Sequence, residues 1–180
     1  MKNLRTVIAG YVPTCEQEER DQALMLSFMD QHEDCLTRDN CIAHFTSSAW
    51  VVNPARDKVL MVYHHIYDSW SWTGGHADGD ADLVNVAYRE AKEETGIESL
   101  KLIQKEPVSL EVITVDGHVK REKYVSSHLH MNLTYLFEAD ESQALHIKAD
   151  ENSGVAWIPI EALSEYVSEP WMLKWVYRKL

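Results

Sequence analysis

The sequence of 180 residues predicts an α/β fold, because segments with helical spacing and segments with strand-like alternation both occur along it. Residues 80–96 place apolar side chains at helical spacing, between an aspartate that can cap a helix and a glycine that can end one. Residues 124–138 alternate apolar and polar side chains, which is typical of a strand. Residues 42–53 and 58–65 form a predicted hairpin, since an Asn-Pro pair opens a turn between them.

The length suits one domain, and 45% hydrophobic residues with six tryptophans suffice for a core. The net charge of −12 argues against a protein that coats nucleic acid or binds an anionic membrane. No apolar run reaches membrane-spanning length. Cys15, Cys35 and Cys41 lack metal-ligand spacing and cannot all pair, which fits a reducing environment. We therefore expect a cytoplasmic protein.

Two units are predicted, a helical extension over residues 1–38 and the main domain over residues 39–180. Residues 4–12 are interpreted as a short strand or an irregular lead-in. Thr14 and Gln17 have the spacing of a capping box for the helix that follows. We expect this helix to cover one edge of the sheet, and a role in substrate specificity or in a homodimer is the alternative.

The central helix of residues 80–96 is preceded by a predicted glycine-rich loop. Gly74 and Gly75 allow backbone to come close to a ligand. Asp80 is the predicted N-cap, Asp82 lies in the first turn, and Gly96 suits the left-handed position after the last turn.

Further elements are predicted after this helix. They are strands at residues 100–104, 108–115 and 155–158, a helix at 159–166 and a last helix from Pro170. Asp116-Gly117 is a strong signal for a hairpin turn.

The central helix carries Glu90, Glu93 and Glu94 within one turn. Like charges at these spacings destabilise a helix by about 0.2–0.5 kcal/mol per pair, and Arg89 can relieve only one of the three. A divalent cation would relieve the rest. Oxygen ligands without Cys or His select Mg²⁺ or Mn²⁺ over Zn²⁺, and Mg²⁺ is commonly shared with substrate phosphates. The residues therefore predict a metal site that handles phosphate.

This stretch resembles the motif of the Nudix hydrolases, which is Gly, five residues, Glu, seven residues, then Arg-Glu-apolar-any-Glu-Glu-any-Gly-apolar. Gly75 and the string from Arg89 to Ile97 match it, whereas Ala81 stands at the position of the first glutamate. The resemblance covers about residues 40–165. It implies the α/β/α sandwich of the family, in which helices flank a mixed, curved sheet.

The resemblance implies hydrolysis of a diphosphate linkage in a substrate of the type nucleoside-diphosphate-X, with Mg²⁺ or Mn²⁺ as cofactor. In the family, the glutamates that match Glu90, Glu93 and Glu94 bind the metal or handle the attacking water. Arg89 matches the arginine that orients these carboxylates. The three glutamates are therefore the predicted metal ligands, and together with Arg89 the predicted catalytic residues.

Two other classes of function remain open. A catalytically silent Nudix module that senses a ligand is conceivable, because Ala81 replaces the motif glutamate. An isomerase acting on an isoprenoid diphosphate would need a catalytic cysteine on a strand near the metal, and Cys41 is the candidate.

Histidines supply further candidates. His128 and His130 share the polar face of a predicted strand, so we expect them to line a pocket, with a solvated face as the alternative. His76 follows the glycine pair and could approach a phosphate or water. These three histidines, together with Gly74 and Gly75, are the predicted substrate-binding residues. Zinc is the less favoured interpretation, since no cysteine accompanies the histidines and the glutamates already account for a metal.

Glu151 precedes the strand predicted at residues 155–158. Nudix enzymes often place an additional acidic residue in the corresponding loop, where it acts as base or metal ligand. The match is one of position alone, and a solvated acidic loop is the preferred interpretation.

Overall fold

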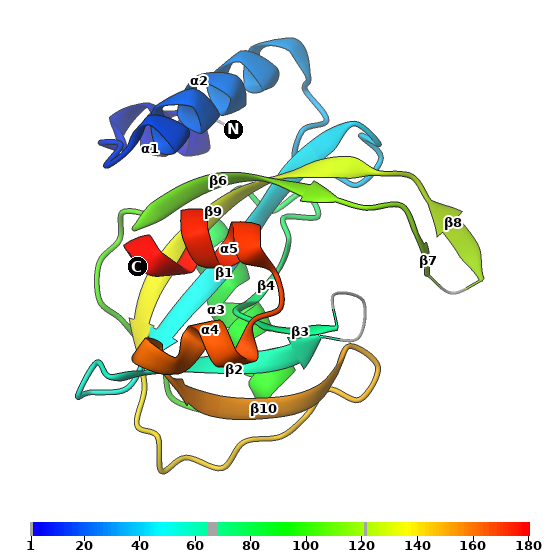
Figure 1. Ribbon diagram of the computed structural model, residues 1–180. Helices are drawn as coiled ribbons and strands as arrows, with labels where there is room; N and C mark the ends of the chain where they lie inside the picture. Colours follow the sequence, from blue (N-terminus) through cyan, green and yellow to red (C-terminus); the bar gives the residue numbers. More distant parts are fainter. Residues whose placement is uncertain (1, 65–67, 121) are drawn as a thin grey trace.

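The computed structural model describes residues 2–64, 68–120 and 122–180, and it has helices on both sides of a mixed sheet (Figure 1). The strands of this sheet are β1 (Ala43–Val52), β2 (Lys58–His64), β3 (Ser69–Ser71), β4 (Thr73–His76), β5 (Lys101–Leu102), β6 (Ser109–Val115), β9 (His128–Glu138) and β10 (Asn152–Pro159). Their order is β10-β2-β1-β9-β5, with β3 beside β2, β4 beside β1 and β6 beside β9. β1 and β9 run parallel and the other pairs antiparallel. The predicted α/β/α architecture is confirmed.

The helices are α1 (Lys2–Gly10), α2 (Glu16–Gln31), α3 (Leu83–Thr95), α4 (Leu163–Tyr166) and α5 (Pro170–Trp175), with 3₁₀ turns η1 (Ile160–Ala162) and η2 (Tyr177–Lys179). α1 and α2 lie together over β6, and α4 and α5 cover the sheet on another side (Figure 1). α3 packs against β1, β4 and β9. In the described parts of the chain, no helix is long and apolar enough to cross a membrane.

The central strands β1 and β9 contribute alternate residues to two different surroundings. Phe45, Met131 and Leu133 are buried in the core that also contains the apolar face of α3. Trp50 points to the other face and packs in a second core with α4 and α5. The start of β1 and the start of β9 carry polar side chains on one face, and there the candidate site forms.

The central helix begins later than expected. Asp82 is its N-cap and accepts a hydrogen bond of 3.2 Å from the backbone N–H of Asn85. The prediction of Asp80 is wrong, because its carboxylate accepts from the backbone N–H of Asp82 at 2.9 Å and thereby shapes the turn before the helix. Gly96 has the predicted left-handed conformation, with φ of 72°.

Three local predictions are wrong. Residues 4–12 are mostly the helix α1, because Leu4 and Ile8, one turn apart, are both buried in the core. Thr14 and Gln17 form no capping box, since the Thr14 backbone N–H and hydroxyl donate instead to Glu18 at 2.8 and 2.9 Å. The glycine-rich segment is not a loop but the strand β4, which pairs with β1.

The hairpin turn predicted at Asp116-Gly117 is also wrong. After β6 the chain continues into a separate two-stranded sheet, β7 (His118–Lys120) and β8 (Lys123–Val125), which extends away from the body (Figure 1). The strand predicted at residues 124–138 is therefore divided between β8 and β9. The actual partner of β6 is β9.

A buried ion cluster joins α2 to the C-terminal segment. The Lys179 ammonium lies 2.8 Å from the Glu18 carboxylate and 3.3 Å from that of Glu111, and both carboxylates are fully buried. The Ser109 hydroxyl bonds to both carboxylates. This cluster fixes the N-terminal helices to β6 and η2.

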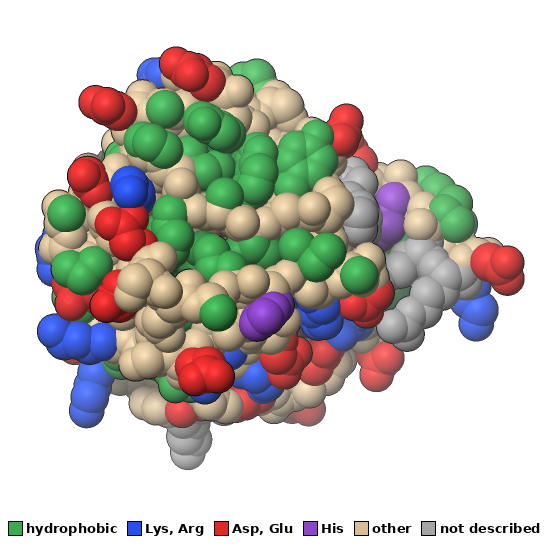
Figure 2. Space-filling view, turned by 90° about the horizontal axis from the view of Figure 1, so that it is seen from below, with side chains coloured by type: hydrophobic (Ala, Val, Ile, Leu, Met, Phe, Trp, Pro, Cys, Tyr) green, Lys and Arg blue, Asp and Glu red, His purple; other side chains and the backbone are tan. Residues whose placement is uncertain are grey.

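The underside of the molecule, as Figure 1 shows it, carries hydrophobic side chains with acidic and basic groups interspersed around them (Figure 2). The net charge of −12 is thus not concentrated into an unbroken acidic surface on this face.

The assignment of residues 1–38 as a separate extension stays a prediction.

Candidate active site

A cavity of about 530 Å³ opens beside β1, β4 and β9. We call the part lined by Glu90, Glu94 and Glu151 its acidic end, and the part lined by a cluster of four histidines in mutual ring contact its histidine end. The histidines are His44, His76, His128 and His130. Trp72, Ile113, Val115 and Met172 contribute an apolar wall. The structure thus brings the predicted glycines, two predicted glutamates and the three predicted histidines to one cavity.

Glu94 is the most buried carboxylate of the acidic end, with 5% of its surface exposed. It accepts a hydrogen bond of 3.1 Å from the Gly74 backbone N–H. Burial raises the pKa of Glu94 to about 8, and the neighbouring Glu90 and Glu151 add to the effect. No ion pair to Glu94 is found among the residues that the structure describes.

The other predicted catalytic residues surround Glu94. Burial also raises the pKa of Glu90, although Arg89, 3.1 Å away, opposes this shift. Glu93 is exposed and lies 3.9 Å from Arg89 and 3.8 Å from Lys148. Arg89 and Glu93 are therefore close to the acidic end but do not line the cavity. Lys148 also forms a 2.8 Å ion pair with Glu151, which brings that loop residue to the acidic end.

The glycine pair is required by close packing between β4 and its neighbours. A Cβ atom on Gly75 would lie 2.5 Å from the Glu90 carboxyl carbon. A Cβ atom on Gly74 would lie 2.7 Å from the Ser47 carbonyl oxygen. Side chains at these positions would therefore displace the helix or the central strand.

The histidine end follows from the register of three adjacent strands. His44 on β1 lies directly beside His130 on β9, and Thr46, two residues further along β1, lies beside His76 on β4. Because side chains alternate along a strand, these residues point to the same face. His128 precedes His130 by two residues and joins the group, with the two Nε2 atoms 3.2 Å apart.

His44 was missed by sequence reasoning. Its side chain is 4% exposed, and burial lowers its pKa. The signal for it lies in the alternation of His44, Thr46 and Ser48 along β1, which places three polar groups on one face of the strand. Burial, together with the nearby His76 and His44, lowers the pKa of His130 to about 2.

Asn132 also lines the cavity, and several hydrogen bonds hold its side chain. Its side-chain oxygen accepts from the hydroxyls of Thr46 and Ser48 at 3.0 and 2.9 Å, and its amide donates to Glu111 at 3.1 Å. Asn132 is thus connected through Glu111 to the buried ion cluster around Lys179. Cys41, the candidate of the isomerase hypothesis, is exposed at the cavity.

The chain is similar to a known family model and to a protein of that family. Residues 44–179 match the model of the NUDIX domain. Nudix hydrolase 27, chloroplastic, from Arabidopsis thaliana is 40% identical over 57 residues, which are 32% of this chain and 25% of that protein. The match thus spans a quarter of the relative's length.

Two solved structures show the same fold. The dihydroneopterin triphosphate pyrophosphohydrolase of E. coli has a TM-score of 0.56 and 14% identity, over 76% of this chain and 93% of that one. A hydrolase of the NUDIX family from Clostridium perfringens has a TM-score of 0.53 and 21% identity, over 76% of this chain and 95% of that one.

Proposed function

The chain belongs to the Nudix hydrolase family, and from this premise we propose that it hydrolyses a diphosphate linkage in a substrate of the type nucleoside-diphosphate-X, with Mg²⁺ or Mn²⁺ as cofactor. One observation carries the proposal. Glu94 is a buried carboxylate at a cavity, with Glu90 and Glu151 beside it and no ion-pair partner in the described ranges of the chain. A buried charge in this state is unfavourable unless a cation is supplied from outside.

The residues at the acidic end fit a hard divalent cation. Their donor atoms are carboxylate oxygens, which Mg²⁺ and Mn²⁺ prefer. Glu90 and Glu94 would hold the ion from the cavity wall, Glu93 would join them from the same helix, and Glu151 would be a further ligand or base. The ion would supply the positive charge that neutralises phosphate oxygens and promotes ionisation of water.

The protein contributes orientation and proton handling. The Gly74 N–H fixes one oxygen of Glu94, and Arg89 holds Glu90. The pKa of about 8 at Glu94 favours proton uptake near neutral pH in the metal-free protein. The apolar wall around Trp72 and the histidine end would bind the remainder of the substrate.

Turnover of nucleotide sugars, dinucleoside polyphosphates and nucleoside triphosphates with Mg²⁺ or Mn²⁺ tests this function. Glu94→Gln should lower kcat by about 10⁴-fold, as loss of a member of a catalytic group does. The exposed Glu98, just after the helix, gives the matched control Glu98→Gln, whose kcat should stay unchanged. Equal turnover by Glu94→Gln and the parent protein would refute the assigned site.

The alternatives make different predictions. A ligand-sensing module would bind metal and substrate without releasing product. An isomerase would lose activity on an isoprenoid diphosphate in the variant Cys41→Ala, since Cys41 lines the same cavity. Product identification by chromatography separates the three cases.

A further inference from the structure

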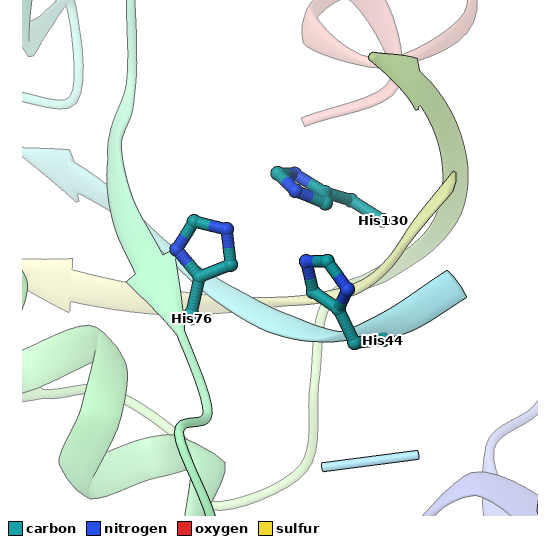
Figure 3. Close-up of side chains that lie close together, drawn as sticks. All are labelled: His44, His76 and His130. Carbon is teal, nitrogen blue, oxygen red and sulfur yellow. The ribbon is translucent and has the colours of Figure 1, made fainter. Parts of the chain in front are cut away.

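The histidine end of the cavity has the geometry of a second, chemically different site. His44, His76 and His130 each offer one ring nitrogen, and these three atoms lie within 4.8 Å of one another. The rings come from β1, β4 and β9 and face a common space (Figure 3). Ligands on three paired strands are held by the sheet itself, which suits a preformed site.

His44 provides an independent sign of a ligand. Its Nδ1 lies 3.1 Å from the Asn40 carbonyl oxygen, so the hydrogen on Nδ1 is donated there and the lone pair is on Nε2. This Nε2 is buried and has no hydrogen-bond partner within the described residues. A buried acceptor without a partner is rare in proteins and unfavourable. A ligand that accepts the lone pair would remove this cost.

Neighbouring groups orient the rings, as metal binding requires. The Nδ1 of His128 lies 2.8 Å from the Ser126 carbonyl oxygen and donates a hydrogen bond to it. Its Nε2 is then the acceptor for His130. Such outer contacts, on His44 and on His130, are typical of histidines that bind metal.

We propose that His44, His76 and His130 form a transition-metal site, with Zn²⁺ as its ion, at the histidine end of the cavity. Three imidazoles select Zn²⁺ over Mg²⁺, whereas the carboxylates select the reverse. Three protein ligands leave a coordination position for a water or for an anionic oxygen of the substrate. Tetrahedral Zn²⁺ places its nitrogen ligands about 3.3 Å apart, so binding would draw the rings closer together.

The test is a metal titration of the full-length protein after removal of bound metals. Excess Mg²⁺ occupies the carboxylates, Co²⁺ serves as the spectroscopic probe, and Zn²⁺ affinity is measured by competition with a coloured chelator. The parent protein should bind one Zn²⁺, and Co²⁺ should give visible bands of nitrogen coordination.

Three variants locate the ion. His44→Ala and His76→Ala should each weaken Zn²⁺ binding by more than about 100-fold, because loss of outer contacts alone costs 10–100-fold. His128→Ala should therefore cost about 10–100-fold. The exposed His146 supplies the control His146→Ala, whose affinity should not change. Circular dichroism checks that each variant is folded, and His76, which is less buried than His44, keeps the test available if His44→Ala unfolds.

The outcome is independent of the proposed hydrolase activity. Glu94→Gln should retain the Zn²⁺ site while it loses turnover, and absence of any turnover would leave the Zn²⁺ result standing. The proposal is overturned if His44→Ala and His76→Ala bind Zn²⁺ as the parent does. It is equally overturned if Glu94→Gln, rather than the histidine variants, abolishes binding.

Discussion

Two pairs of buried carboxylates in this molecule differ in where their compensating charge comes from. Glu18 and Glu111 share the ammonium of Lys179, which the chain itself supplies. Glu90 and Glu94 face a cavity, and among the residues that the structure describes the Glu94 carboxylate accepts a hydrogen bond from the Gly74 N–H alone. The first pair is a structural device that closes the fold. In the proposed function a cation from outside would complete the second pair, and this need would separate a binding site from a structural ion cluster.

The largest effect on this comparison is expected from Lys179→Met. Removing the ammonium leaves two buried carboxylates uncompensated, and the free energy of unfolding should fall by about 3–5 kcal/mol. Urea unfolding measures this loss in the free energy of unfolding. Lys101→Met is the control, because Lys101 is exposed and pairs loosely with Glu138 at 3.6 Å, so its effect should stay within about 0.5 kcal/mol. Equal effects of the two variants would remove the distinction.

Acid should weaken the structural pair through Glu18. Burial opposes the charge, but hydrogen bonds from Lys179 and Thr14 outweigh it and lower the pKa of Glu18 from 4.5 to about 2. A lowered pKa gives stability that is present above pH 4.5 and is lost as the pH falls toward 2, about 3 kcal/mol in total. Urea midpoints between pH 6 and pH 2.5 should fall less steeply in Glu18→Gln than in the parent. Parallel profiles would contradict this.

The cavity pair should respond in the opposite direction. In metal-free buffer at pH 7, Glu94 must take up a proton on folding because its pKa rises from 4.5 to about 8, and Glu94→Gln removes this cost while it keeps an oxygen for the Gly74 N–H. The free energy of unfolding should therefore rise by about 1–3 kcal/mol while turnover is lost. Thermal unfolding in the presence of a chelator measures this, with Glu98→Gln as the control. A destabilised Glu94→Gln would mean that Glu94 is compensated within the protein.

The smallest effect is expected from Lys148→Ala. Lys148 lies beside the acidic end but pairs with Glu151 and Glu93, both of which are partly solvated. Its removal should change the free energy of unfolding by no more than about 1 kcal/mol. A loss as large as that of Lys179→Met would show that Lys148 already neutralises the cavity carboxylates.

The sequence predicted the parts of the fold that depend on neighbours along the chain. The helix α3 was recognised because its apolar spacing and Gly96 are local signals. Its start was misplaced by two residues, since Asp80 and Asp82 can both cap a helix and only the turn geometry decides between them. α1 was misread because its helical form depends on packing of Leu4 and Ile8 into the core.

The site was predictable to the extent that one segment carries it. Glu90, Glu94 and the glycine pair lie within the recognised motif, and they meet at the cavity. His44 lies 30 residues before Gly74 and joins His130 through the parallel pairing of β1 with β9. The contact of Glu18 with Lys179, 161 residues apart, gave no local signal at all.

The absence of a side chain at Gly75 has a mechanical consequence. Glu90 of α3 fills the space that a Cβ atom would need, and the next residue along β4 is His76. The helix α3 and the strand β4 are therefore in direct contact at this point. A ligand that displaced Glu90 would therefore bear directly on the strand backbone next to His76.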